Sequence, residues 1–226
     1  MKRQIIFASD KGGVGKSYGS RTFLDLARRA GRTVSAWDLD GSTGSLALLY
    51  PDRNPQVGAG IEDVRDPKAK GEWLEALYGA ADDVLLDVPG GALDDLTRVL
   101  DGGAPSLVAE ARNAGRELVV VSVIGIKRDA TGTPQDAIDR FGSAVHHVVL
   151  KNGYFGDADD FVIFDGVDRG PRGPRERPVD RLRARRGRRA QTRRGTQLGV
   201  WLPPRPRRHP HALLAGRQSV APALRA

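Results

Sequence analysis

Eight residues near the start of the chain have the types and spacing needed to bind a polyphosphate. They run from Asp10 to Ser17 and read Asp-Lys-Gly-Gly-Val-Gly-Lys-Ser. Glycine has no Cβ and adopts positive φ, so such a loop can turn its N–H groups inward around phosphate oxygens. Lys16 adds a mobile positive charge, and the hydroxyl of Ser17 suits Mg²⁺. The chemistry that these residues predict is nucleotide binding.

The elements on either side of this loop would present it to a ligand. The apolar run Gln4–Ala8 predicts a strand before it, and the pattern from Thr22 to Ala30 predicts an amphipathic helix that ends at Gly31. The free N–H groups and the positive dipole end of that helix would face the phosphates. We expect the nucleotide to contact the loop and the start of the helix, at Gly12, Gly13, Val14, Gly15, Lys16, Ser17 and Tyr18.

The loop departs from the ordinary Walker A pattern, which requires glycine where this chain has Asp10. It resembles instead the deviant form Lys-Gly-Gly-x-Gly-Lys-Ser of the ParA/MinD family of dimerising ATPases, in which Lys11 is the additional lysine. The resemblance extends over residues 1–164. It implies that Lys11 reaches across a homodimer interface to the phosphates bound by the partner.

Two later strands end in carboxylates. The run from Thr33 to Trp37 leads into Asp38-Leu39-Asp40-Gly41, and the apolar run after Asp83 ends at Asp87, before Pro-Gly-Gly. Ligands of doubly wound parallel sheets bind at the carboxyl ends of the strands, and Mg²⁺ prefers hard oxygen ligands. We therefore interpret the strand that ends at Asp87 as a Walker B strand.

The family resemblance assigns roles to these residues. It implies a switch I at Asp38 and Asp40, in which Asp40 positions the attacking water and Asp38 lies nearer the metal. It implies a switch II in which Gly90 meets the γ-phosphate. The implied metal ligands are Ser17, Asp38 and Asp87. The family often has Pro-Gln or Asn where this chain continues with Gly-Ser-Thr, and a simple β-turn is the alternative for the first acidic segment.

The remaining patterns complete an α/β fold. We expect a doubly wound, mostly parallel sheet of the P-loop type with helices on both faces. Further strands are predicted at Leu118–Ile124, His146–Leu150 and Phe161–Phe164, and helices at Ser45–Tyr50, Gly71–Ala80, Leu93–Leu100, Ser106–Ala114 and Pro134–Phe141. Asn152 follows a late strand, where the resemblance implies an adenine contact; an Asn-Gly turn is the alternative.

Composition excludes several classes of protein. The chain has no cysteine, which rules out disulfides, Cys-ligated zinc and iron–sulfur clusters. No apolar run has the length of a membrane span or of a signal-peptide core. A cytoplasmic location is the expectation.

The net charge of +8 is unevenly distributed along the chain. Residues 1–164 carry a net charge of −5, whereas residues 165–226 carry +13, with 17 arginines and no lysine. Eight prolines and seven glycines also fall in this second segment. We expect residues 1–164 to form the P-loop domain, which would lack the family's C-terminal elements, and residues 165–226 to form a basic, low-complexity, disordered tail.

Two interpretations of this tail remain open. The absence of lysine beside 17 arginines suggests a segment read in a shifted frame of a GC-rich gene. The alternative is a polybasic arm that binds DNA or RNA through phosphate contacts, with an affinity that falls steeply in salt.

Together, the motifs predict Mg²⁺-dependent ATP hydrolysis by a nucleotide-switched homodimer. The resemblance implies plasmid or chromosome partitioning or the positioning of other cargo, with DNA and an adaptor protein that stimulates hydrolysis as partners. Two alternatives are an ATP-dependent biosynthetic ligase on the same scaffold and a nucleotide-binding module that does not hydrolyse. A ligase would need a small-molecule acceptor, and such a module would show no turnover.

Overall fold

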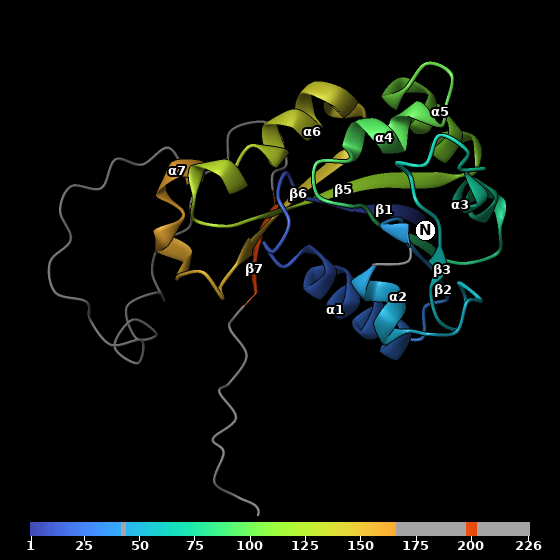
Figure 1. Ribbon diagram of the computed structural model, residues 1–226, viewed down its shortest axis with the longest axis horizontal. Coiled ribbons are helices and arrows are strands. Elements are labelled where there is room, and N and C mark those ends of the chain that lie inside the picture. The colour runs from blue at the N-terminus through green and yellow to red at the C-terminus, as the bar shows by residue number, and fades with distance from the viewer. Residues whose placement is uncertain (42–43, 166–197, 203–226) are drawn as a thin grey trace, which may run out of the picture.

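The computed structural model describes residues 1–41, 44–165 and 198–202, which build one parallel sheet with helices on both faces (Figure 1). The strand order is β3-β2-β4-β1-β5-β6-β7, and every pair is parallel. This confirms the predicted doubly wound sheet. The strands are β1 Lys2–Ala8, β2 Val34–Asp38, β3 Gly60–Ile61, β4 Asp83–Asp87, β5 Arg116–Ile124, β6 His146–Asn152 and β7 Leu198–Leu202.

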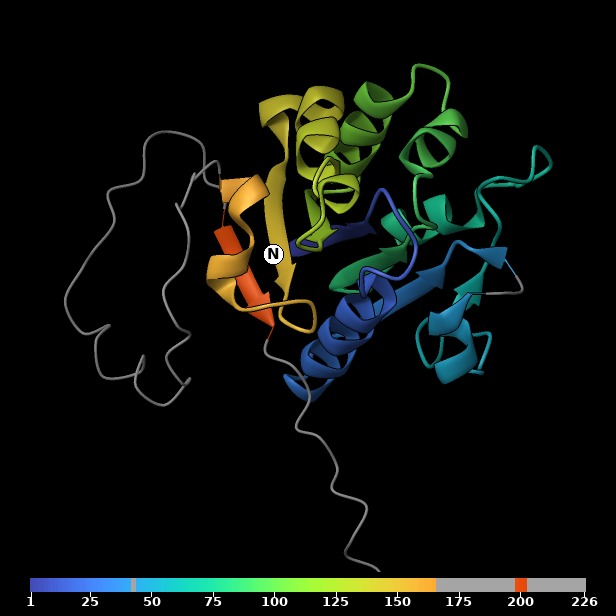
Figure 2. The ribbon, with the colours of Figure 1, turned by 60° about the vertical axis from the view of Figure 1, so that its left-hand side comes forward.

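Helices cover the two faces of the sheet in separate groups (Figures 1 and 2). One face packs against α1 (Lys16–Arg29) and α2 (Ser45–Leu49). The other packs against α3 (Glu72–Glu75), η2 (Ala76–Tyr78), α4 (Leu93–Arg98), α5 (Ala104–Asn113) and α6 (Thr133–Phe141). Shorter turns are η3 (Arg128–Ala130), η4 (Gly142–Ala144) and η5 (Ala158–Asp160), followed by α7 (Val162–Asp165).

The central strand β1 shows why the apolar runs form this sheet. Ile5 and Phe7 pack into the core below α1, whereas Ile6 and Ala8 pack into the opposite core. Successive side chains of a strand point to opposite faces, so a strand covered on both sides is apolar at nearly every position. The continuous apolar runs of the sequence are therefore the buried strands.

Two short elements differ from the sequence-based expectations. The segment Phe161–Phe164, which we predicted as a strand, forms helix α7 instead, from Val162 onward. Phe161 is fully buried against Ile124 and Val149 in a small cluster at this end of the sheet. Four apolar residues carry no periodicity that distinguishes a strand from a helix. In addition, β3 lies in a segment for which the sequence predicted no strand.

Most of the predicted basic tail lies outside the described residues. Within it, the structure describes Asp165 at the end of α7 and the strand β7. β7 pairs with β6 from Val148↔Leu198 to Asn152↔Leu202 and so extends the sheet by one strand. The expectation that the chain after Phe164 contributes no strand is corrected at these five residues. In the Gly-Ser-Thr segment after Asp40, Gly41 is described, whereas Ser42 and Thr43 lie outside the described residues.

The strand order brings the three predicted chemical segments to one edge of the sheet. β4 lies between β1 and β2, and Asp87 is in register with both Phe7 and Asp38. Because all three strands are parallel, the loops that follow them emerge side by side. The phosphate loop follows β1, the acidic segment follows β2, and the Pro-Gly-Gly segment follows β4.

Candidate nucleotide site

The phosphate loop has the backbone conformation of an anion-binding turn. Gly13 and Gly15 have φ angles of 80° and 94°, in the left-handed region that favours glycine. Gly15 is the N-cap of α1, and no described side chain caps this helix end or places an acid in its first turn. The first N–H groups of a 14-residue helix therefore remain for an anion, together with the positive end of its dipole.

A buried ion pair lies directly below this loop. The Nζ of Lys16 is 2.5 Å from Oδ1 of Asp87 and 3.4 Å from the Oγ of Ser17. The Lys16 side chain is 11% exposed and that of Asp87 is 1% exposed. Lys16, Ser17 and Asp87, which were predicted to hold phosphate and metal, therefore lie together. In the sequence, Asp87 is about 70 residues from the other two.

Asp38 lies beside Asp87 on the neighbouring strand and is also buried. Its carboxylate accepts hydrogen bonds from the backbone N–H groups of Ala47, at 2.9 Å, and Asp40, at 3.2 Å. Burial raises the pKa of Asp38, and the nearby Asp87 raises it further against these hydrogen bonds. Asp38 thus anchors the segment after β2 and the first turn of α2.

Asp40 is held at the surface by a residue that sequence reasoning missed. Its Oδ1 is 3.4 Å from Nη1 of Arg65, whose Nη2 donates a hydrogen bond to the carbonyl of Gly90 at 2.7 Å. Arg65 therefore connects the segment after β2 to the segment after β4. It lies in the loop after β3, and no motif marks it.

Gly90 packs directly on the phosphate loop. A Cβ at this position would lie 3.0 Å from both the backbone N of Gly12 and the backbone carbon of Lys11. The next residue, Gly91, donates its N–H to the carbonyl of Ser9 at 2.8 Å. The segment after β4 therefore lies against the phosphate loop, and a side chain at Gly90 would require the loop backbone to shift by a few tenths of an ångström.

Lys11 points away from the buried pair. Its ammonium group bonds to the carboxylate of Asp129 in η3, and both side chains are about half exposed. This hydrogen bond lowers the pKa of Asp129. The preceding residue, Asp10, donates its N–H to the buried hydroxyl of Thr133 at 2.7 Å. The segment from η3 to the start of α6 therefore supports the phosphate loop, through residues that the sequence did not single out.

Asn152 reaches the phosphate loop from the carboxyl end of β6. Its Nδ2 donates to the carbonyl of Val14 at 2.8 Å, and its Oδ1 accepts from the N–H of Tyr154 at 3.1 Å. The structure thus places Asn152 at the predicted site, in contact with the loop backbone. Tyr18 lies in the first turn of α1, where its carbonyl accepts a hydrogen bond from the hydroxyl of Thr22 at 2.7 Å.

The oxygen donors at this edge fit a magnesium nucleotide better than a metal held by protein alone. Ser17, Asp38 and Asp87 supply only hard oxygens, the ligand class that Mg²⁺ prefers. No group of three or more His, Cys, Asp or Glu side chains that could hold a metal occurs in the described part of the chain. Mg²⁺ commonly binds through one or two carboxylates, water and substrate phosphates, and the donors present match that pattern.

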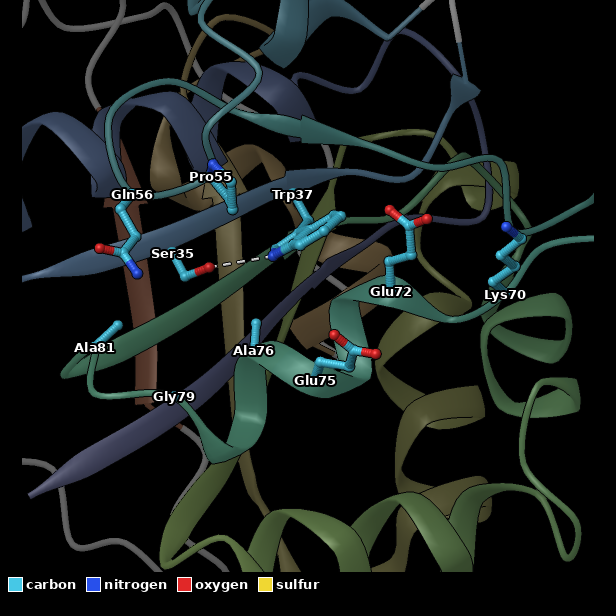
Figure 3. A pocket seen from close by; sticks show the side chains of 10 residues that line it. All are labelled: Ser35, Trp37, Pro55, Gln56, Lys70, Glu72, Glu75, Ala76, Gly79 and Ala81. Atoms are coloured by element: carbon cyan, nitrogen blue, oxygen red, sulfur yellow. Dashed lines mark hydrogen bonds between the residues drawn. The ribbon is translucent and has the colours of Figure 1, made fainter.

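A separate cavity of about 480 Å³ lies beside β2, where Ser35 and Trp37 line it (Figure 3). The indole of Trp37 lies on its wall and donates to the hydroxyl of Ser35 at 3.2 Å, while Glu72 and Glu75 reach it from α3. None of the predicted site residues lines this cavity. Among the described helices, none is both long and apolar enough to cross a bilayer.

Comparison with solved structures finds several similar chains. A plasmid partition protein from Borrelia burgdorferi is 13% identical, with a TM-score of 0.48 over 73% of this chain and 84% of that one. The cell division ATPase MinD from Pyrococcus furiosus is 18% identical, with a TM-score of 0.49 over 74% and 81%. MinD from Pyrococcus horikoshii, solved with Mg-ADP, is 19% identical, with a TM-score of 0.45 over 73% and 77%.

The likeness is one of fold alone, and the doubly wound α/β architecture follows from this chain's own strand order. The sequence matches no protein-family model, and it has no significant match among curated proteins.

Proposed function

We propose that this protein is a Mg²⁺-dependent ATPase that dimerises when it binds ATP, of the ParA/MinD type. The observation that carries the proposal is the meeting of Lys16, Asp87 and Asp38 below a glycine loop at the N-terminus of α1. Nucleotide binding accounts for this combination of a helix N-terminus, a mobile cation and buried carboxylates at one sheet edge.

Each residue then has a defined task. Lys16 leaves its ion pair with Asp87 and neutralises the β and γ phosphates instead. Ser17 and Asp87 would hold the metal. Asp38 supports the metal side of the site from β2. When bound, Mg²⁺ neutralises charge that develops on the phosphates. Asp40 orients the attacking water from the surface segment that Arg65 connects to Gly90.

Lys11 completes the site of a second copy of the chain. In the single chain its ammonium lies outward, bonded to Asp129 and about half exposed. A cation presented outward from the phosphate loop can stabilise charge on a partner's phosphates, as an arginine finger does. This supports a homodimer whose formation depends on ATP.

The process served by the switch is proposed from the resemblance of the loop motif. Partitioning of plasmids or chromosomes, or the positioning of another cargo, would use the ATP-bound dimer to bind DNA and an adaptor protein to stimulate hydrolysis. A cytoplasmic location accompanies this proposal.

The direct test of the nucleotide site is the variant Lys16→Ala. We expect it to reduce ATP binding by at least about 100-fold, because a cation buried beside the phosphate loop has no substitute among its neighbours. Calorimetric titration with ATP and Mg²⁺ measures this loss. The control is Lys68→Ala, which removes an exposed lysine far from the loop in sequence. Full ATP affinity in Lys16→Ala would refute the assignment of the site.

A further inference from the structure

The amide of Asn152 is fixed at both ends by the protein backbone. Its side chain donates to the carbonyl of Val14 and accepts from the N–H of Tyr154, and the residue is 7% exposed. The two bonds together determine which way the amide faces, because a flipped amide would lose both. Asn152 is therefore a rigid support beneath the phosphate loop.

The contact also explains the third glycine of the loop. A Cβ at Gly15 would lie 2.2 Å from Nδ2 of Asn152, far inside any allowed contact. Gly15 also has a φ of 94°, which disfavours other residues. The space beside Gly15 is thus occupied by Asn152, and the loop and this side chain fit as one unit.

The hydrogen bond from Asn152 to the carbonyl of Val14 also affects the N–H of Gly15, which belongs to the same peptide group. This carbonyl and the N–H of Gly15 belong to one planar unit, and the described chain has no cis peptide bond. In a trans peptide the C=O and N–H groups point in opposite directions. By holding the carbonyl, Asn152 also fixes the direction of the Gly15 N–H, at the end of α1 that no described side chain caps.

We propose that Asn152 is a positioning residue that orients the phosphate loop for the polyphosphate part of its ligand. It acts through the Val14–Gly15 peptide, in place of the adenine contact implied by the motif resemblance. This inference rests on the proposed nucleotide site. Its ligand class is the triphosphate group, whether carried by a nucleoside or not.

A comparison of ATP with inorganic tripolyphosphate, which has no base, distinguishes the two roles considered for Asn152: orienting the phosphate loop and contacting adenine. We would titrate both ligands, with Mg²⁺, into the wild-type protein and the variants Asn152→Asp and Asn152→Ala. The first replaces the donor by an oxygen that faces the Val14 carbonyl, and the second removes the amide. The matched control is Asn113→Asp, which makes the same change at an exposed position in α5.

We expect both Asn152 variants to lose affinity for both ligands by the same factor, on the order of tenfold, the effect of one buried hydrogen bond. The Asn113 variant should bind as the wild type does. Thermal melts followed by circular dichroism verify that each variant is folded at the assay temperature. If one of the two Asn152 variants is unfolded, the other still allows the test.

Three results would count against the proposal. A loss confined to ATP, with tripolyphosphate affinity unchanged, would show that Asn152 acts on the nucleoside. Wild-type affinity for both ligands in the folded variants would show that the contact does not position the loop. If the wild-type protein bound neither ligand, the proposed nucleotide site itself would fail, and the role of Asn152 with it.

Discussion

At the scale of single residues, the charges of the site divide into buried and exposed ones. Lys16, Asp87 and Asp38 are buried, where an unpaired charge is costly and each must keep a partner. Lys11 and Asp129 are exposed, where an ion pair forms and breaks easily. We infer that the first group binds nucleotide within one chain and that Lys11 is available to a second chain.

This division predicts different effects for the two lysines. Lys11→Ala should leave ATP affinity within about twofold of wild type. It should lower the turnover rate by about 10³-fold, which is the low end of the range for removal of a cation supplied in trans. Equilibrium titration and steady-state ATPase assays measure the two quantities. Asp129→Asn serves as the control, because it breaks the same ion pair and keeps Lys11. If Lys11→Ala hydrolysed ATP at the wild-type rate, Lys11 would have no catalytic role.

At the scale of elements, ion pairs fasten the N-terminal ends of the strands opposite the site. The carboxylate of Asp83, fully buried at the start of β4, accepts paired hydrogen bonds from Arg3 of β1, at 2.8 and 2.9 Å. It also accepts a second pair from Arg32, which lies just before β2, at 2.7 and 2.8 Å. One carboxylate thus joins the three chain segments that carry the site at their other ends.

The pKa of Asp83 gives this arrangement a measurable signature. Burial raises it, but the hydrogen bonds and charges of Arg32 and Arg3 outweigh burial, so the pKa is lowered overall. A carboxyl whose pKa is lower in the folded protein stabilises it above the unfolded value, near 4, and this stabilisation disappears as pH falls through the folded value.

We therefore expect Asp83→Asn to lower the free energy of unfolding by about 3 kcal/mol at pH 7, because it removes the buried partner of two arginines. The difference from wild type should shrink as the pH falls below about 4. Urea unfolding at several pH values measures both. Asp66→Asn, at an exposed loop carboxylate, is the control. A difference that stays constant from pH 7 to pH 3 would contradict this account.

The elements also show how far the sequence predicts this structure. Apolar runs that end in glycine loops or acids identified β1, β2 and β4 with their site residues, because burial on both faces requires such runs. Arg65, Asp129 and Thr133 could not be found in this way. They reach the site from the loop after β3, from η3 and from the first residue of α6, and their place depends on the order of strands in the sheet, which no local spacing encodes.

The same limit explains the errors at the end of the chain. Leu198–Leu202 is a five-residue strand signal that contains a glycine and follows an arginine-rich stretch, so composition concealed it. The assignment of β7 depends on the free edge of β6, which is a property of the assembled sheet.

At the scale of the whole molecule, the positive charge of the chain is concentrated in the C-terminal part of its sequence. The net charge of +8 arises from the 17 arginines after residue 164, and 12 of them lie between residues 169 and 194. If these residues are not a DNA-binding arm, replacing the 12 with glutamine should leave DNA affinity at physiological salt unchanged. Filter binding or anisotropy measures it, with the wild-type chain as the reference. A large loss of affinity and of its salt dependence would establish the arm.

The central claim, an ATPase switched by dimerisation, is tested most directly by the rate of ATP hydrolysis per molecule as a function of protein concentration. If Lys11 acts across the interface, the rate per molecule should rise with concentration until the dimer is saturated, and Lys11→Ala should remove this rise. A rate per molecule that is the same at every concentration, or the absence of hydrolysis throughout, would contradict the account.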